Sequence, residues 1–163
     1  MNIIIKKNLL LFKDYKLKCS VGKSGSIYLK KEGDFATPKG LFKLGTIYYR
    51  KDRIESFKSS LKKKVIKKNL GWCNDPRSSM YNREIYFPYK YSAEKLYRQD
   101  NIYDIFINIK YNQSPIVKRK GSAIFLHLIK KKYKPTEGCV AISKEDFFKI
   151  LPHINNKTKI LII

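Results

Sequence analysis

A cysteine and a histidine near the C-terminal end of the chain are the residues best suited to covalent chemistry. Cys139 follows Gly138 and precedes Val140–Ile142, an apolar run that is typical of a short buried strand. A cysteine at a glycine turn leaves backbone N–H groups free to hold a developing oxyanion, and an imidazole can take the thiol proton. Eleven residues separate His127 from Cys139, enough for a strand, a loop and a return. The alternative is a buried structural thiol beside a packed histidine, because an unpaired cysteine is most often a small core residue.

Length and charge narrow the class of protein. The 163 residues fit one domain that can bury a core, and 43% of them are hydrophobic. The chain has 36 Lys and Arg against 13 Asp and Glu, a net charge of +23. This surplus predicts attraction to polyanions such as nucleic acid, anionic lipid or anionic wall polymers. The alternative is compositional drift, because Lys, Ile, Asn and Tyr are all abundant, as A/T-rich codons would produce.

The cysteine pattern and the apolar runs exclude several other classes. Cys19, Cys73 and Cys139 are odd in number and widely spaced, which does not indicate a disulfide framework. No Cys-x-x-Cys or closely spaced histidine pair is present, so we expect neither a metal nor a cofactor. Lysines interrupt the apolar N-terminal segment, which does not support a signal peptide. No apolar run is long enough to predict a membrane span.

Short extended runs, punctuated by Gly, Pro, Asn and Asp, predict a mainly β domain of about seven to ten strands with one or two short helices. Ser143, followed by acidic residues, predicts a helix over residues 144–151 that Pro152 ends. A second short helix is expected over residues 92–98, with Ser92 as its cap. The main expected strands are residues 2–5, 9–12, 15–19, 26–30, 41–50, 103–111, 122–128 and 159–163.

The segment of residues 71–98 is loop-rich and aromatic. Long ordered loops in compact domains are often functional, which makes this segment a candidate wall of a binding site. The alternative is that its aromatic rings only attach the loop to the sheet.

Four segments, in order, make the chain resemble the L,D-transpeptidase catalytic domain of the YkuD type. They are residues 33–44 (GDFATPKGLFKL), 71–85 (GWCNDPRSSMYNREI), 92–112 (SAEKLYRQDNIYDIFINIKYN) and 121–143 (GSAIFLHLIKKKYKPTEGCVAIS). The resemblance implies one β-sandwich-like catalytic domain over residues 1–163. It also implies an acyl-thioester on Cys139, with His127 as the base and Gly138 as the turn glycine.

The same resemblance suggests where a substrate would lie. Thr136 occupies the family's Ser/Thr position three residues before the cysteine, and Glu137 stands where many members have a second histidine. We expect Tyr81, Asn82 and Arg98 beside the substrate groove, with Arg98 pairing with a substrate carboxylate. The alternative for Arg98 is an i, i+4 pair with Glu94 on the expected helix.

The resemblance implies a role in peptidoglycan biosynthesis and cell shape. Family members attack an L,D-peptide bond of a stem peptide, release the terminal D-Ala and pass the acyl group to an amine. This implies a location in the cell envelope or periplasm, although with no signal peptide visible the cytoplasm stays open. We expect a monomer without a membrane span or an obligatory nucleic acid. The alternatives are an L,D-carboxypeptidase-type cysteine hydrolase and a non-catalytic basic β domain that binds wall polymer or nucleic acid.

Overall fold

A computed structural model describes residues 1–163, with fourteen strands, one α-helix and one 3-10 turn. The helix is α1 (Lys144–Ile150), and the turn η1 (Leu151–His153) follows it directly. No helix in the structure is both long enough and apolar enough to cross a membrane. The strands are β1 (Ile3–Lys6), β2 (Leu9–Phe12), β3 (Tyr15–Lys18), β4 (Ser26–Ile27), β5 (Thr37–Pro38), β6 (Gly40–Tyr49), β7 (Lys63–Val65), β8 (Leu70–Cys73), β9 (Glu84–Tyr86), β10 (Ala93–Lys95), β11 (Ile105–Ile109), β12 (Phe125–Leu128), β13 (Val140–Ile142) and β14 (Lys159–Ile162).

Nine strands form one sheet that nearly closes on itself. Its order is β13-β12-β11-β6-β14-β1-β2-β3, with β7 beside β6. Ser20, just after β3, exchanges two backbone hydrogen bonds with Ala141 in β13, at 2.8 and 2.9 Å. The two ends of the sheet therefore meet, and few backbone groups are left at an open edge.

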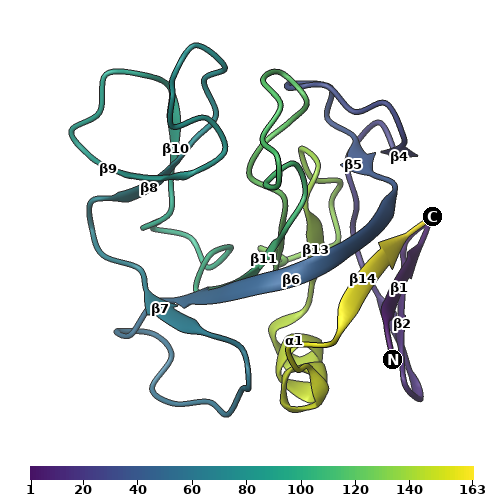
Figure 1. Ribbon diagram of the computed structural model, residues 1–163. Helices are drawn as coiled ribbons and strands as arrows, with labels where there is room; N and C mark the ends of the chain where they lie inside the picture. The colour runs from purple at the N-terminus through teal and green to yellow at the C-terminus, as the bar shows by residue number, and fades with distance from the viewer.

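The long strand β6 joins the two halves of this sheet. One end pairs with β14 and the other with β11, with a register shift in the β6–β11 pair. Figure 1 shows β6 running diagonally across the molecule, with β14, β1 and β2 at one end and β7 at the other. The separate three-stranded sheet, in the order β10-β8-β9, lies beyond the β7 end, and α1 lies below β6.

Two hydrophobic clusters hold the strands together. The larger contains 24 buried residues, mostly aliphatic, and includes Phe147 and Ile150 of α1. The smaller is largely aromatic and joins the small sheet to the large one through Trp72 and Phe125, whose ring centroids lie 5.2 Å apart. Cys139 packs against this aromatic cluster, so the clustered rings form a rigid support beside the thiol.

The expected mainly β fold with one or two short helices is confirmed. Ser143 caps α1 as expected, because its hydroxyl accepts from the Asp146 N–H at 3.0 Å. The structure has more strands than the sequence predicts, because several contain only two or three residues. The predicted helix over residues 92–98 is wrong. Part of that segment forms β10, where Glu94 pairs opposite Trp72 of β8. Pairing with this buried strand overrides the local helix-capping signal.

Candidate active site

A cavity of about 870 Å³ opens at the turn that leads into β13. Cys139 and His127 both line it, together with Thr136, Arg98 and Glu94. Cys139 is partly exposed, whereas Cys19 and Cys73 are buried, and all three thiols are free. Cys139 is therefore the thiol that a substrate in this cavity would meet.

The register of two parallel strands places Cys139 and His127 on the same face. β12 pairs with β13 so that Leu126 lies beside Val140 and His127 beside Ala141. Cys139, one residue before β13, has the same side-chain direction as Ala141, because side chains alternate along a strand. The cysteine and the histidine are thus diagonal neighbours on the face that borders the cavity.

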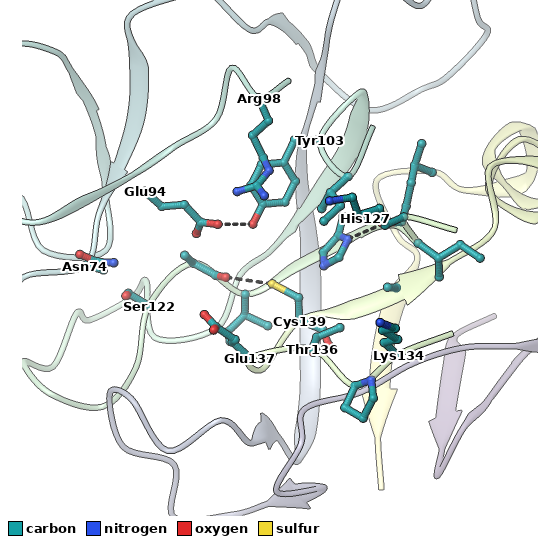
Figure 2. Close-up of a pocket in the computed structure, with 18 of the residues that line it drawn as sticks. Asn74, Glu94, Arg98, Tyr103, Ser122, His127, Lys134, Thr136, Glu137 and Cys139 are labelled. Atoms are coloured by element: carbon teal, nitrogen blue, oxygen red, sulfur yellow. Dashed lines mark hydrogen bonds between the residues drawn. The ribbon is translucent and has the colours of Figure 1, made fainter. Parts of the chain in front are cut away.

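A backbone carbonyl orients the His127 ring. Nδ1 lies 2.8 Å from the carbonyl oxygen of Leu128, and a carbonyl can only accept, so Nδ1 carries the proton. This leaves Nε2 as the acceptor, and Figure 2 shows this side of the ring turned toward Cys139. Burial lowers the pKa of His127 to about 4, so the imidazole is neutral near pH 7. The side chain is ready to take a proton.

The Cys139 thiol lies between two backbone groups of the neighbouring strand segment. It donates to the carbonyl oxygen of Ala123 at 3.2 Å and accepts from the Phe125 N–H at 3.3 Å. Burial raises the pKa of the thiol to about 12, and the negative charge of Glu94 adds to that effect. The Phe125 N–H and Lys30 act in the opposite direction. The resting site therefore holds a neutral thiol and a neutral imidazole rather than an ion pair.

The turn before Cys139 requires glycine and is held by Thr136. Gly138 has φ +139, and a Cβ there would lie 2.9 Å from the carbonyl oxygen of Ala36. The Thr136 hydroxyl donates to the Cys139 carbonyl at 2.6 Å and accepts from the Gly138 N–H at 3.1 Å. The Cys139 N–H donates to no hydrogen bond, so it is free to meet a developing oxyanion.

Tyr81 and Asn82, predicted beside the substrate groove, do not line the cavity. Their side chains are 0% and 2% exposed. The Tyr81 hydroxyl donates to Glu32 and accepts from the Gly121 N–H, and Asn82 Oδ1 accepts from Trp72 Nε1 and the Ala123 N–H. Both residues instead hold the segment that carries Ala123 in the wall of the site. They are buried because these hydrogen bonds tie the loop to distant parts of the chain.

Arg98 lines the cavity, and its side chain pairs with Asp100. Its Nε and one terminal nitrogen each donate to the Asp100 carboxylate at 2.8 Å. The alternative pair with Glu94 does not form, because the segment is not helical. Glu94 accepts instead from the Tyr103 hydroxyl at 2.6 Å.

Sequence reasoning missed three groups near the thiol. Glu94 and Tyr103 line the cavity, and the Tyr103 ring packs edge-on against His127 with centroids 5.5 Å apart. Lys30 is 5% exposed, pairs with Asp34 at 2.6 Å and lies beneath the Gly138 turn. No local pattern marks these side chains, because they come from distant segments that only tertiary pairing brings together.

Comparison with known families identifies the family of the chain. The model of the L,D-transpeptidase catalytic domain, named YkuD, matches residues 3–162. The chain therefore belongs to the L,D-transpeptidase catalytic domain family. Members of this family act on peptidoglycan and are generally associated with the cell envelope. No curated protein sequence matches the chain.

Among solved structures, the chain is similar to the helical cell shape determining protein Pgp2 from Campylobacter jejuni, with 16% identity and a TM-score of 0.53. A point mutant of Pgp2 matches with the same identity and a TM-score of 0.52. Each match covers 99% of this chain and 46% of the other, so the chain spans less than half the length of these proteins. At this identity the likeness establishes the fold alone.

Proposed function

We propose that this protein is a cysteine-dependent L,D-transpeptidase that acts on peptidoglycan stem peptides in the cell envelope, where it contributes to wall biosynthesis and cell shape. The observation that carries the proposal is the free Nε2 acceptor of His127 in the same cavity as the accessible Cys139 thiol. Family membership supports the substrate class. In this proposal residues 1–163 act as one catalytic domain.

The first step is attack of the thiol on the carbonyl carbon of the L,D-peptide bond. The S–H bond rotates away from Ala123 O and gives its proton to His127 Nε2 as sulfur attacks. Coupled transfer is required because the thiol is un-ionised at neutral pH. The Phe125 N–H, already aimed at the sulfur, stabilises the charge that develops on it.

The second step is collapse of the tetrahedral intermediate. The Cys139 N–H holds the oxyanion, while the imidazolium returns its proton to the leaving amine of D-Ala. The Gly138 N–H cannot be a second donor in this geometry because Thr136 already accepts from it. The acyl group then stays on Cys139 as a thioester until an amine, or water in the hydrolase alternative, displaces it.

A covalent adduct tests the nucleophile. We expect a carbapenem to acylate Cys139 in the native protein, and mass spectrometry of the digested protein to place the added mass there. Cys19 and Cys73 serve as internal controls because both are buried. Label on those two residues without label on Cys139 would contradict the assignment.

Turnover and products test the reaction. We expect Cys139→Ser and Cys139→Ala to fold normally and to lose turnover of a tetrapeptide muropeptide. Near-native turnover by either variant would make Cys139 structural. Products formed with and without an added amine distinguish the two reactions: a transpeptidase forms a new amide, whereas a carboxypeptidase releases only D-Ala and the shortened peptide.

A further inference from the structure

A second cavity, of about 590 Å³, borders the loop that joins β12 and β13. It is formed where this loop meets the turn between β1 and β2 and the segment between β3 and β4. Figure 1 shows β4 and β5 at one edge of the molecule, above the C-terminus. Pro135 of the loop lines both this cavity and the one at Cys139. The proposed transpeptidation uses no side chain of this second cavity.

Positively charged side chains line the second cavity without a negative partner. They are Lys7, Lys18, Lys23 and Lys39. None of the four takes part in an ion pair. No Asp or Glu lines this cavity, whereas three Glu residues line the one at Cys139. The four ammonium groups repel one another, and a bound anion would offset that repulsion.

Three of these lysines lie over aromatic rings. The pairs, with the distance from Nζ to the ring centroid, are Lys18 and Tyr133 at 4.9 Å, Lys23 and Phe35 at 5.4 Å, and Lys39 and Tyr28 at 5.4 Å. Such a contact restricts a flexible lysine side chain. Less conformational entropy is then lost when these ammonium groups bind a ligand.

Neutral donors without a partner line the same cavity. Ser20 is only 4% exposed, yet its hydroxyl forms no hydrogen bond. Ser20 pairs with Ala141 across the sheet, so its side chain points to the same face as Ala141, which lines the neighbouring cavity. Asn74 Oδ1 is the only side-chain nitrogen or oxygen that is fully buried without a partner, so the Ser20 hydroxyl keeps some accessible surface. Because an unpaired hydroxyl in such a place is costly, a ligand that accepts from it would stabilise the site.

The backbone of the glycine-containing segment 22–26 (GKSGS) does not supply the donors. The Gly22 N–H already donates to the Thr37 hydroxyl at 2.8 Å. The Lys23 N–H donates to the Thr136 carbonyl at 2.9 Å. Binding of an anion therefore depends on the side chains that line the cavity.

This set of donors fits a phosphate better than a carboxylate. A phosphate group has three strong acceptor oxygens and a charge of about −1.5 to −2 at neutral pH. A carboxylate has two acceptor oxygens in one plane and a single charge, which suits the planar fork of arginine. Here the donors are separate ammonium groups from different segments and a hydroxyl, so they can approach different oxygens of a tetrahedral ion.

We propose that the second cavity binds a phosphate group, held by the ammonium groups of Lys18 and Lys23 and by the Ser20 hydroxyl. The charges of Lys7 and Lys39 add to the attraction. Because the Lys23 N–H bonds the backbone of Thr136, this site adjoins the turn that carries Cys139. A phosphate-bearing molecule bound there lies next to the active site without entering it.

Calorimetric titration of the full chain with inorganic phosphate, at constant ionic strength, tests the site. We expect saturable binding of one phosphate per chain. Ser20→Ala leaves the net charge unchanged and should weaken binding about 5-fold, as for one neutral hydrogen bond. Its melting temperature should match that of the native protein, because the hydroxyl has no partner to lose. Absence of saturable binding, or equal binding by Ser20→Ala, would overturn the proposal.

Matched lysine variants separate the site from diffuse attraction. The double variant Lys18→Gln, Lys23→Gln should weaken phosphate binding about 10- to 100-fold. The control is the double variant Lys51→Gln, Lys157→Gln, which removes the same charge at exposed positions outside the cavity. It should weaken binding less than about 2-fold, because salt screens distant charges. Equal losses in the two double variants would assign the binding to net charge and overturn the site.

Competition and vesicles identify the ligand. Acetate at the same ionic strength should displace phosphate poorly, and displacement as effective as by phosphate itself would overturn the choice of phosphate. Vesicles of equal parts phosphatidylglycerol and phosphatidylcholine then distinguish two sources. Sedimentation with vesicles that is weakened by Ser20→Ala would assign the site to a lipid headgroup. Sedimentation unaffected by Ser20→Ala, with binding of inorganic phosphate still weakened, would assign it to phosphate in solution.

Discussion

At the scale of single residues, the site is built around a proton acceptor rather than a preformed thiolate. The Nδ1–H of His127 donates a hydrogen bond to the Leu128 carbonyl and Nε2 stays free, while burial favours the neutral forms of both imidazole and thiol. In the proposed reaction, attack on a substrate carbonyl and proton transfer to His127 occur together.

The histidine assignment predicts an asymmetric pair of variants. We expect His127→Ala to lower kcat/KM for the muropeptide by about two to four orders of magnitude, the usual scale for a general base. His153→Ala should leave it unchanged, because His153 is exposed on η1, outside the cavity, and hydrogen-bonds Lys13 and Tyr15. Equal losses in both variants would indicate a folding defect, and a loss confined to His153→Ala would overturn the assignment.

Burial of His127 also predicts how stability depends on pH. Its pKa falls from 6.5 in the unfolded chain to about 4 in the folded protein. Between these values the unfolded chain binds a proton that the folded protein does not. The contribution of neutral His127 is therefore complete above pH 6.5 and is lost as the pH falls toward 4. Denaturant titrations should show a smaller loss over this window in His127→Gln than in the native protein, and identical losses would contradict it.

Among the elements around the site, the turn before Cys139 is held by the Thr136 hydroxyl, which bonds both the Gly138 N–H and the Cys139 carbonyl. We expect Thr136→Val to lower both turnover and the melting temperature, because it leaves the Gly138 N–H without its acceptor, at a cost of about 1–3 kcal/mol. Thr136→Ser keeps the hydroxyl and should recover most of both. Thermal unfolding and muropeptide kinetics measured together check this, and a Val variant equal to the Ser variant would remove the role of the hydroxyl.

For the molecule as a whole, we expect the net charge of +23 to attract anionic wall polymer at long range rather than to act within the active site. We expect binding to insoluble peptidoglycan to weaken as salt rises from low to physiological ionic strength, where the Debye length shrinks to about 8 Å. The binding of small neutral substrates should change little over the same range of salt. Sedimentation of the protein with purified sacculi measures this. Binding that is independent of salt would assign the lysine surplus to composition alone.

Features that depend on local order could be predicted from the amino-acid sequence. The alternation of short runs indicates a β fold, Ser143 and Pro152 mark the bounds of the helix, and the Gly138-Cys139 turn marks the candidate nucleophile. These signals depend on neighbouring residues and on backbone rules that hold wherever the segment lies. Four ordered segments were sufficient to suggest the family.

The side chains that surround the thiol, in contrast, depend on long-range pairing and could not be predicted locally. Residues 92–98 contain a helix-capping pattern, yet pairing of β10 with the buried β8 turned Glu94 into a wall of the cavity. Tyr81, predicted beside the substrate groove, is fully buried, where its hydroxyl hydrogen-bonds Glu32 and the Gly121 N–H. Such outcomes depend on contacts between residues far apart in the chain. Together these long-range contacts contribute more free energy than the local preferences that sequence patterns report, which are about 0.3–1 kcal/mol each.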